Sequence, residues 1–249
     1  MRILVTFAVD AEFAPWRKLR DFRKTTAAGV DYFSTQFAGA ELHVFFTGIA
    51  GKSAWLEPAT ALYDSEIDVC ISSGLAGGLR PEHKLGEILV ADKVLDFKRD
   101  LSAFSEPSLV ESAIATGAKT AVFYTADHVV LTAAEKQKLG TFADAVEMES
   151  CGVLVEAGLF AAKTVAIRAI SDTSEENLPL DFNKVTNDSG DVSLARVLGE
   201  VFSAPSSIPA LMRFGQRSRL AAQSLANFLE RYVQALVVEL NSASVGPVQ

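Results

Sequence analysis

The chain has 249 residues, 49% of them hydrophobic, and its formal net charge at pH 7 is −8. This length and composition predict one large α/β domain that can bury a core without crosslinks. The negative charge argues against nucleic acid as a partner and against attachment to anionic membranes, because both would repel the protein. Cys70 and Cys151 form no paired motif, which argues against a zinc site and indicates a reducing compartment.

The start of the chain does not fit a secretory signal peptide. Asp10 and Glu12 interrupt the apolar run of the first residues too early for one. Elsewhere no apolar run approaches the ~20 residues that a membrane span requires. The three histidines have no metal-ligand spacing. We therefore expect a cytoplasmic protein that holds no metal ion.

Hydrophobic patterning predicts strands that alternate with helices, which favours a layered α/β domain. The predicted strands are Ile3–Val9, Asp31–Phe37, Glu41–Thr47, Ile67–Ser72, Gly86–Leu95, Ala121–Tyr124 and Thr164–Ser171. The predicted helices are Ala11–Leu19, Lys52–Tyr63, a helix that begins at Thr132 with a capping-box pattern, and Glu149–Gly158. A long polar loop is expected over 173–191.

The pattern changes from Pro209 onward. Apolar residues such as Leu211, Phe214, Leu225 and Leu236 recur at steps of three or four, which predicts one long amphipathic helix. We expect a domain over residues 1–203, a helical extension over 204–241 that packs on the same domain, and a frayed tail over 242–249.

A lone carboxylate, Asp172, follows the last predicted strand of the core. In open α/β sheets ligands bind beyond the carboxyl ends of the strands, so this position suits a general acid. Arg168 lies four residues earlier and therefore on the same face of the strand. A structural ion pair between the two residues is the alternative interpretation.

Two other carboxylates are candidates: Glu149 at the start of a predicted helix, and Glu12 just after the first predicted strand. Glu149 could accept hydrogen bonds from two vicinal hydroxyls and stabilise a cationic sugar, and Glu12 could act as a general base for water. Each also fits an ordinary residue in the first turn of a helix. The glycines of Gly74–Gly78 would let a ligand approach the backbone, or would simply form a tight turn. Their spacing is neither that of a dinucleotide fingerprint nor that of a P-loop.

Five segments in this order resemble the purine and uridine phosphorylase superfamily, which includes the methylthioadenosine/S-adenosylhomocysteine nucleosidases. They are Ile3–Glu12, Thr47–Lys52, Ser73–Gly78, Val146–Glu149 and Arg168–Asp172. The resemblance covers about residues 1–185. It implies a three-layer α/β/α fold around a twisted mixed sheet, and a homo-oligomer that acts on a small nucleoside. Cleavage of a ribosyl bond needs no metal or organic cofactor, and a phosphorylase would take inorganic phosphate as co-substrate.

The resemblance also implies roles for individual residues. Asp172 matches the acid that protonates N7 of the leaving purine, and Glu12 matches the carboxylate that activates water. Arg168 matches an arginine that helps hold that water or its phosphate counterpart, while Met148 and Glu149 match the pair that binds the ribose. The other candidate substrate-binding residues are Glu147, Ser171, Gly74, Leu75, Ala76, Asp127, Val129 and Val130.

The sequence departs from the family pattern in two places. Leu75 stands where relatives carry a small hydroxyl residue that binds the water or the phosphate, and no arginine precedes Gly74, where many phosphorylases place a phosphate ligand. With Glu12 present and that arginine missing, hydrolysis is favoured over phosphorolysis. Arg17 and Lys52 leave phosphorolysis open, and Leu75 leaves open a nucleoside-binding protein without turnover. A structural protein that has no nucleoside site is a further alternative.

The segment from Leu178 to Leu236 is more similar to the hopanoid-associated phosphorylases, which are thought to act on adenosyl-hopane. Arg213, Arg217 and Arg219 could then face a membrane, although packing of the helix on its own domain or on a second subunit is favoured. The sequence as a whole predicts an enzyme that hydrolyses the N-glycosidic bond of a purine nucleoside, an adenosine derivative.

Overall fold

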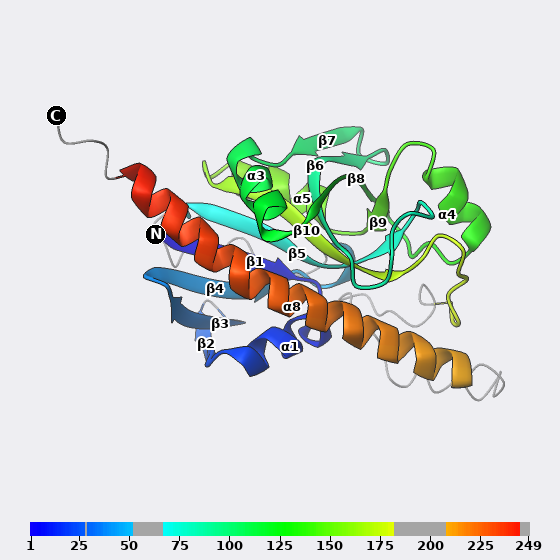
Figure 1. Ribbon diagram of the computed structural model, residues 1–249, viewed down its shortest axis with the longest axis horizontal. Helices are drawn as coiled ribbons and strands as arrows, with labels where there is room; N and C mark the ends of the chain where they lie inside the picture. Colours follow the sequence, from blue (N-terminus) through cyan, green and yellow to red (C-terminus); the bar gives the residue numbers. More distant parts are fainter. Residues whose placement is uncertain (28, 52–66, 182–207, 245–249) are drawn as a thin grey trace.

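The computed structural model describes residues 1–27, 29–51, 67–181 and 208–244 (Figure 1). The predicted helix over 52–63 lies outside these residues, and so does most of the predicted loop over 173–191. The strands are β1 (Arg2–Phe7), β2 (Arg23–Ala27), β3 (Val30–Phe37), β4 (Ala40–Phe46), β5 (Val69–Gly78), β6 (Ile88–Asp96), β7 (Leu101–Phe104), β8 (Lys119–Thr125), β9 (Ala145–Glu147) and β10 (Lys163–Asp172). The helices are α1 (Asp10–Leu19), the short 3₁₀ turn η1 (Ile49–Gly51), α3 (Pro107–Thr116), α4 (Ala133–Leu139), α5 (Ser150–Gly158) and α8 (Ile208–Ser244).

The strands form one mixed sheet in the order β10-β6-β8-β9-β5-β1-β4-β3-β2, with β7 paired to β6. β5 pairs with β1 and β10 in parallel and with β9 in antiparallel fashion. Because β5 meets both β9 and β10, five strands close into a ring and the other strands extend from it as an open sheet. The expected α/β fold with a mixed sheet and a long C-terminal helix is confirmed.

Alternate side chains of the central strands enter different cores, as the two-residue period of a strand requires. In β1, Ile3 and Val5 join the core that includes α1, α3 and α8, whereas Leu4 joins a core that includes α5. In Figure 1, α1, α3 and α8 lie over one face of the sheet, with α5 behind it. The strands between these two helical layers are buried on both faces, which explains their continuous apolar sequences.

The long helix α8 runs across the sheet between α1 and α3 (Figure 1). Phe228 and Tyr232 are fully buried there, and the Tyr232 hydroxyl donates to the Leu109 carbonyl at 2.9 Å. The indole N–H of Trp16 in α1 donates to Glu230 at 2.9 Å. The helix is therefore part of the core. Within the described residues, no helix is long and apolar enough to cross a membrane.

Four elements were absent from the sequence prediction: β2, β7, β9 and α3. Three of these are short or exposed strands with no continuous apolar run, while α3 carries ordinary signals, Pro107 at its start and Gly117 at its end. The predicted strand ending at Ser72 instead continues to Gly78, because β10 and β9 pair with its glycine-rich half. The capping prediction holds at Thr132, whose hydroxyl accepts the Glu135 N–H at 3.2 Å.

Candidate functional site

A cavity of about 220 Å³ opens where β1, β5, β9 and β10 end, at the edge of the sheet where a ligand was expected. Most of the predicted site residues line it: Glu12, Leu75, Ala76, Val129, Val130, Glu147, Met148, Glu149, Ser171 and Asp172. Segments far apart in the sequence thus meet around one space. In particular, Glu149 and Asp172 share one cavity.

Three predicted residues do not line this cavity. Arg168 lies underneath it and is only 1% exposed. Gly74 also lies behind the wall, against Arg168 and Glu12. The third, Asp127, binds Lys98 at 2.9 Å and His128 at 2.6 Å through its carboxylate. These two partners hold the pKa of Asp127 down to about 2. A role of Asp127 in substrate binding stays a prediction, while the adjacent His128 lines the cavity.

Arg168 does not pair with Asp172, which was the structural alternative. Its Nη2 lies 2.7 Å from Glu147 Oε2 and 3.4 Å from Glu149 Oε2. Burial opposes ionisation of Glu147, but Arg168 and the Thr125 hydroxyl outweigh it, so the pKa of Glu147 is lowered. Glu147 is therefore the main counterion of the buried guanidinium.

Glu149 precedes α5, and its Oε1 accepts the backbone N–H of Ala50 in η1 at 2.9 Å. Burial raises the pKa of Glu149 to about 8, and repulsion from Glu147 and Glu12 adds to this effect despite Arg168. A carboxyl with this pKa changes its charge near neutral pH. It can therefore hold a proton, and it can accept hydrogen bonds from a ligand once it is ionised.

Glu12 reaches back from α1 to the glycine-rich half of β5. Its carboxylate accepts backbone N–H groups from Ala8 at 3.0 Å and from Leu75 at 2.9 Å. Burial raises the pKa of Glu12 although Arg168 and these N–H groups oppose it. A raised pKa makes the ionised carboxylate a better base.

Glu12 can lie this close to the backbone of β5 only because residue 74 is a glycine. A Cβ at Gly74 would come within 2.9 Å of Glu12 Oε1 and 3.1 Å of Arg168 Nη1. Arg168 Nη1 and Nε are buried and have no hydrogen-bond partner among the described residues. A buried N–H group in this position calls for an acceptor, such as a water molecule or an anion.

Asp172 ends β10 and is held at both carboxylate oxygens. Oδ1 accepts the Ser171 hydroxyl at 2.6 Å, and Oδ2 pairs with the buried ammonium of Lys136 in α4. Gly77 allows this packing, because a Cβ there would lie 3.1 Å from Oδ2. Sequence reasoning did not identify Lys136, since a lysine in a short polar helix gives no signal of burial.

Apolar side chains form the rest of the wall. Val129, Val130 and Met148 were predicted individually, and Ile49, Leu178 and Phe214 line the cavity as well. Phe214 comes from the first turns of α8. The sequence placed Phe214 on the apolar face of that helix, and the structure brings this end of the helix to the site.

A second cavity of about 490 Å³ adjoins the first and shares Asp172, Leu178 and Phe214 with it. Its outer wall includes Arg213 and Arg217 of α8, and Arg217 pairs with Glu176. The two cavities together fall within the range typical of small-ligand sites.

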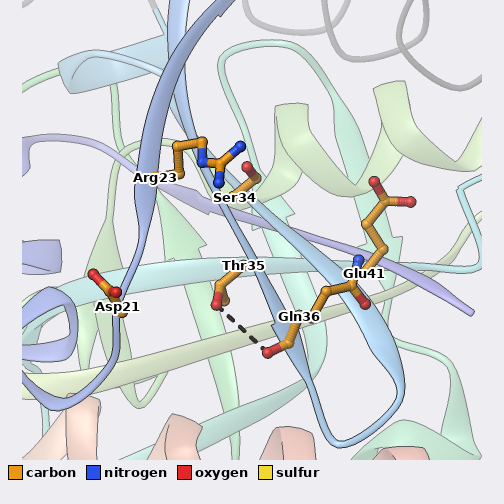
Figure 2. Close-up of a pocket in the computed structure, with 6 residues that line it drawn as sticks. All are labelled: Asp21, Arg23, Ser34, Thr35, Gln36 and Glu41. Carbon is orange, nitrogen blue, oxygen red and sulfur yellow. Dashed lines mark hydrogen bonds between the residues drawn. The ribbon is translucent and has the colours of Figure 1, made fainter.

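A third hollow, of about 550 Å³, lies away from these carboxylates on the β2–β4 hairpins. Its lining is Asp21, Arg23, Ser34, Thr35, Gln36 and Glu41. Figure 2 shows these side chains spread along neighbouring strands, with Asp21 and Glu41 at opposite sides of the group. The residues do not converge on one point, so this hollow is a poor candidate for chemistry. Among the described residues, no cluster of His, Cys, Asp or Glu could hold a metal ion.

Several known proteins are similar to this chain. The chain is 23% identical over 222 residues to an aminodeoxyfutalosine nucleosidase of Campylobacter jejuni, covering 80% of this chain and 97% of the relative. It is 26% identical over 203 residues to a 5′-methylthioadenosine/S-adenosylhomocysteine nucleosidase of a Marinomonas species, covering 71% and 88%.

A solved structure of a 5′-methylthioadenosine/S-adenosylhomocysteine nucleosidase from Campylobacter jejuni has the same fold, with a TM-score of 0.69 at 19% identity, covering 94% of this chain and 99% of that one. The family model described as the phosphorylase superfamily matches residues 2–203. The resemblance inferred from the five segments is therefore confirmed, and the chain is an enzyme that belongs to the phosphorylase superfamily.

Proposed function

We propose that the protein hydrolyses the N-glycosidic bond of a purine nucleoside of the adenosine type. The observation that carries this proposal is that Glu149 and Asp172 line one cavity together with Glu12. Three carboxylates around one cavity can bind the sugar, protonate the base and activate the water nucleophile. The nucleosidase relatives support the same reaction class.

In this mechanism Glu149 binds the ribose hydroxyls, and its charge stabilises the oxocarbenium-like transition state. Asp172 gives a proton to the base as the bond between C1′ and the base nitrogen breaks, so the electron pair leaves with a neutral purine. Glu12 takes a proton from water as the water oxygen bonds to C1′. Arg168 supports the reaction from below, with its unpartnered Nη1 facing the place where the water would lie.

The apolar wall suits a base and the 5′ group of a nucleoside. Val129, Val130 and Phe214 offer contact surface to an aromatic ring. The adjoining cavity leaves room for a substituent, and Arg213 and Arg217 would favour one that carries negative charge. Aminodeoxyfutalosine and S-adenosylhomocysteine, both named for the relatives, are thus suitable trial substrates beside 5′-methylthioadenosine.

Product analysis on a panel of adenosine derivatives, with and without inorganic phosphate, tests the proposal. We expect free base and free sugar in the absence of phosphate. Strict phosphate dependence with a ribose 1-phosphate product would show a phosphorylase instead. Binding without turnover of any nucleoside would show a binding protein.

Two variants test the residue roles. Asp172→Asn and Glu149→Gln should each abolish base release, while Glu111→Gln, an exposed site on α3, should leave it unchanged. Circular dichroism should show all three proteins folded. Near-normal turnover in either of the first two variants would disprove the mechanism.

A further inference from the structure

Lys136 is a fully buried lysine that no step above uses. It lies in α4, its side chain is 0% exposed, and its ammonium points at the loop after β10. A buried ammonium is costly unless all its N–H groups have acceptors. Lys136 has three: the Asp172 carboxylate, the Thr173 carbonyl at 3.0 Å and the Glu176 carbonyl at 2.9 Å. Its neighbour Lys138, on the same short helix, is exposed.

Of these acceptors only Asp172 carries a charge. The nearby Glu176 carboxylate is occupied elsewhere, since it pairs with Arg217 and accepts the Thr173 N–H at 2.9 Å. The Lys136 ammonium and the Asp172 carboxylate are thus each other's counterions. The Ser171 hydroxyl binds the opposite oxygen, so the carboxyl of Asp172 is fixed in orientation at the wall of the cavity.

This arrangement matters for a residue that gives up a proton. Asp172 first takes up a proton from solvent. As it then passes this proton to the base, negative charge returns to its carboxyl group, and the fixed Lys136 cation beside Oδ2 stabilises that charge without having to reorient. The two carbonyls bound by Lys136 also anchor the first turn of the loop after Asp172.

We propose that Lys136 is a positioning residue for base departure: it holds the Asp172 carboxyl in place and stabilises the charge formed there when the proton moves to the leaving base. Lys136 itself transfers no proton and touches no substrate. This inference rests on the proposed role of Asp172 as the acid.

The first test compares Lys136→Met, which keeps the length of the side chain, with Lys138→Met as the matched control. With an adenosine derivative as substrate, we expect Lys136→Met to lower kcat by about 10²-fold, the size of a lost charge-stabilising contact, with little change in KM. Lys138→Met should match the wild type. Wild-type kcat in Lys136→Met would overturn the proposal.

The second test uses 4-nitrophenyl β-D-ribofuranoside, whose leaving group departs as a stable anion and needs no proton. The Lys136→Met and Asp172→Asn variants should cleave it at close to the wild-type rate, because sugar binding and the nucleophile are intact. If Lys136→Met cleaved both substrates more slowly by the same factor, Lys136 would have only a structural role.

The Asp172→Asn variant separates the two hypotheses. If Asp172→Asn keeps normal turnover of the adenosine derivative, both the proposed function and the inference about Lys136 are wrong. If Asp172→Asn is inactive on that substrate while Lys136→Met is fully active, only the inference about Lys136 fails.

Discussion

Arg168 and Glu147 form a buried ion pair in which Nη2 lies 2.7 Å from Oε2, with both side chains almost completely shielded from solvent. Backbone N–H groups of Glu149 and Ser150 also donate to the same carboxylate oxygen, at 2.9 and 2.7 Å. Glu147 therefore neutralises most of the guanidinium charge. Arg168 therefore stabilises the charge of Glu149 less than that of Glu147, which fits the raised pKa of Glu149.

Arg168→Met should destabilise the protein strongly. The substitution leaves Glu147, Glu149 and Glu12 buried without their shared cation, and breaking a buried ion pair typically costs about 3–5 kcal/mol. Urea unfolding at pH 7 measures the change, with Arg231→Met at an exposed position of α8 as control. A loss no larger than that of the control would show that Arg168 is not the electrostatic centre of the site.

The pH dependence of kcat/KM should report Glu149. Because its pKa in the empty site is about 8, most of the free enzyme carries a proton there at neutral pH. Binding of the ribose hydroxyls by a carboxylate then improves as pH rises, so kcat/KM should increase up to about pH 8. The Glu149→Gln variant should be much slower and should lack this rise. A profile already flat below neutral pH in the wild type would contradict the assignment.

The same group should affect stability. Folding raises the pKa of Glu149 above its ordinary value of 4.5, so between these two values the folded protein binds more protons than the unfolded chain. The contribution of Glu149 to stability is therefore greatest below pH 4.5 and decreases as pH rises to about 8. Urea unfolding over this range should show a shallower decline in Glu149→Gln than in the wild type. Parallel curves would rule out this linkage.

Gly74→Ala should impair turnover more than folding. The φ angle of +152° and the close approach of Glu12 and Arg168 leave no room for a Cβ, so Glu12 has to move. Displacement of a catalytic group can cost about 10²-fold in rate. Steady-state kinetics should show the loss in kcat. Gly158→Ala, where a Cβ meets open space, should behave as the wild type, and equal activity of the two variants would contradict this account.

Phe228→Ala should show that α8 belongs to the core. Phe228 is 1% exposed and stacks on Tyr232, and deletion of a buried phenyl ring costs about 3–5 kcal/mol. Thermal and urea unfolding should both register the loss as one cooperative transition. Val238→Ala, at an exposed position of the same helix, should cost little. A separate early transition in Phe228→Ala would mean that the helix unfolds independently.

The sequence was sufficient for elements with a strong periodic signal. The apolar runs that became β1, β5 and β10 and the helical stripe of α8 were predicted because burial on one or both faces determines their residue types. The same argument placed Asp172 at a strand end and Glu149 at the start of a helix, and the structure brings both to one cavity. Their catalytic roles stay predictions.

Contacts between side chains from distant segments could not be predicted from the sequence. From the sequence, Lys136 would be expected to be an exposed residue of a polar helix, whereas in the fold it lies against Asp172. Nor could the sequence show that the Asp127 carboxylate pairs with both Lys98 and His128. The short strand β9 is only three residues long and has no periodicity to detect, yet it closes the ring of strands.

The position of β5 has a consequence for the slow motions of the molecule. Residues Val69 to Ser72 have β1 on one side and β10 on the other, so each of their amides faces a neighbouring strand and can reach water only if that strand separates. Local fraying cannot expose them, and deuterium should replace their protons only when the whole domain opens. The edge strand β2, paired on one side with β3, should exchange far sooner. Strand β5, which belongs to both the closed ring and the open sheet, should thus contain the amides that are most strongly protected against hydrogen exchange.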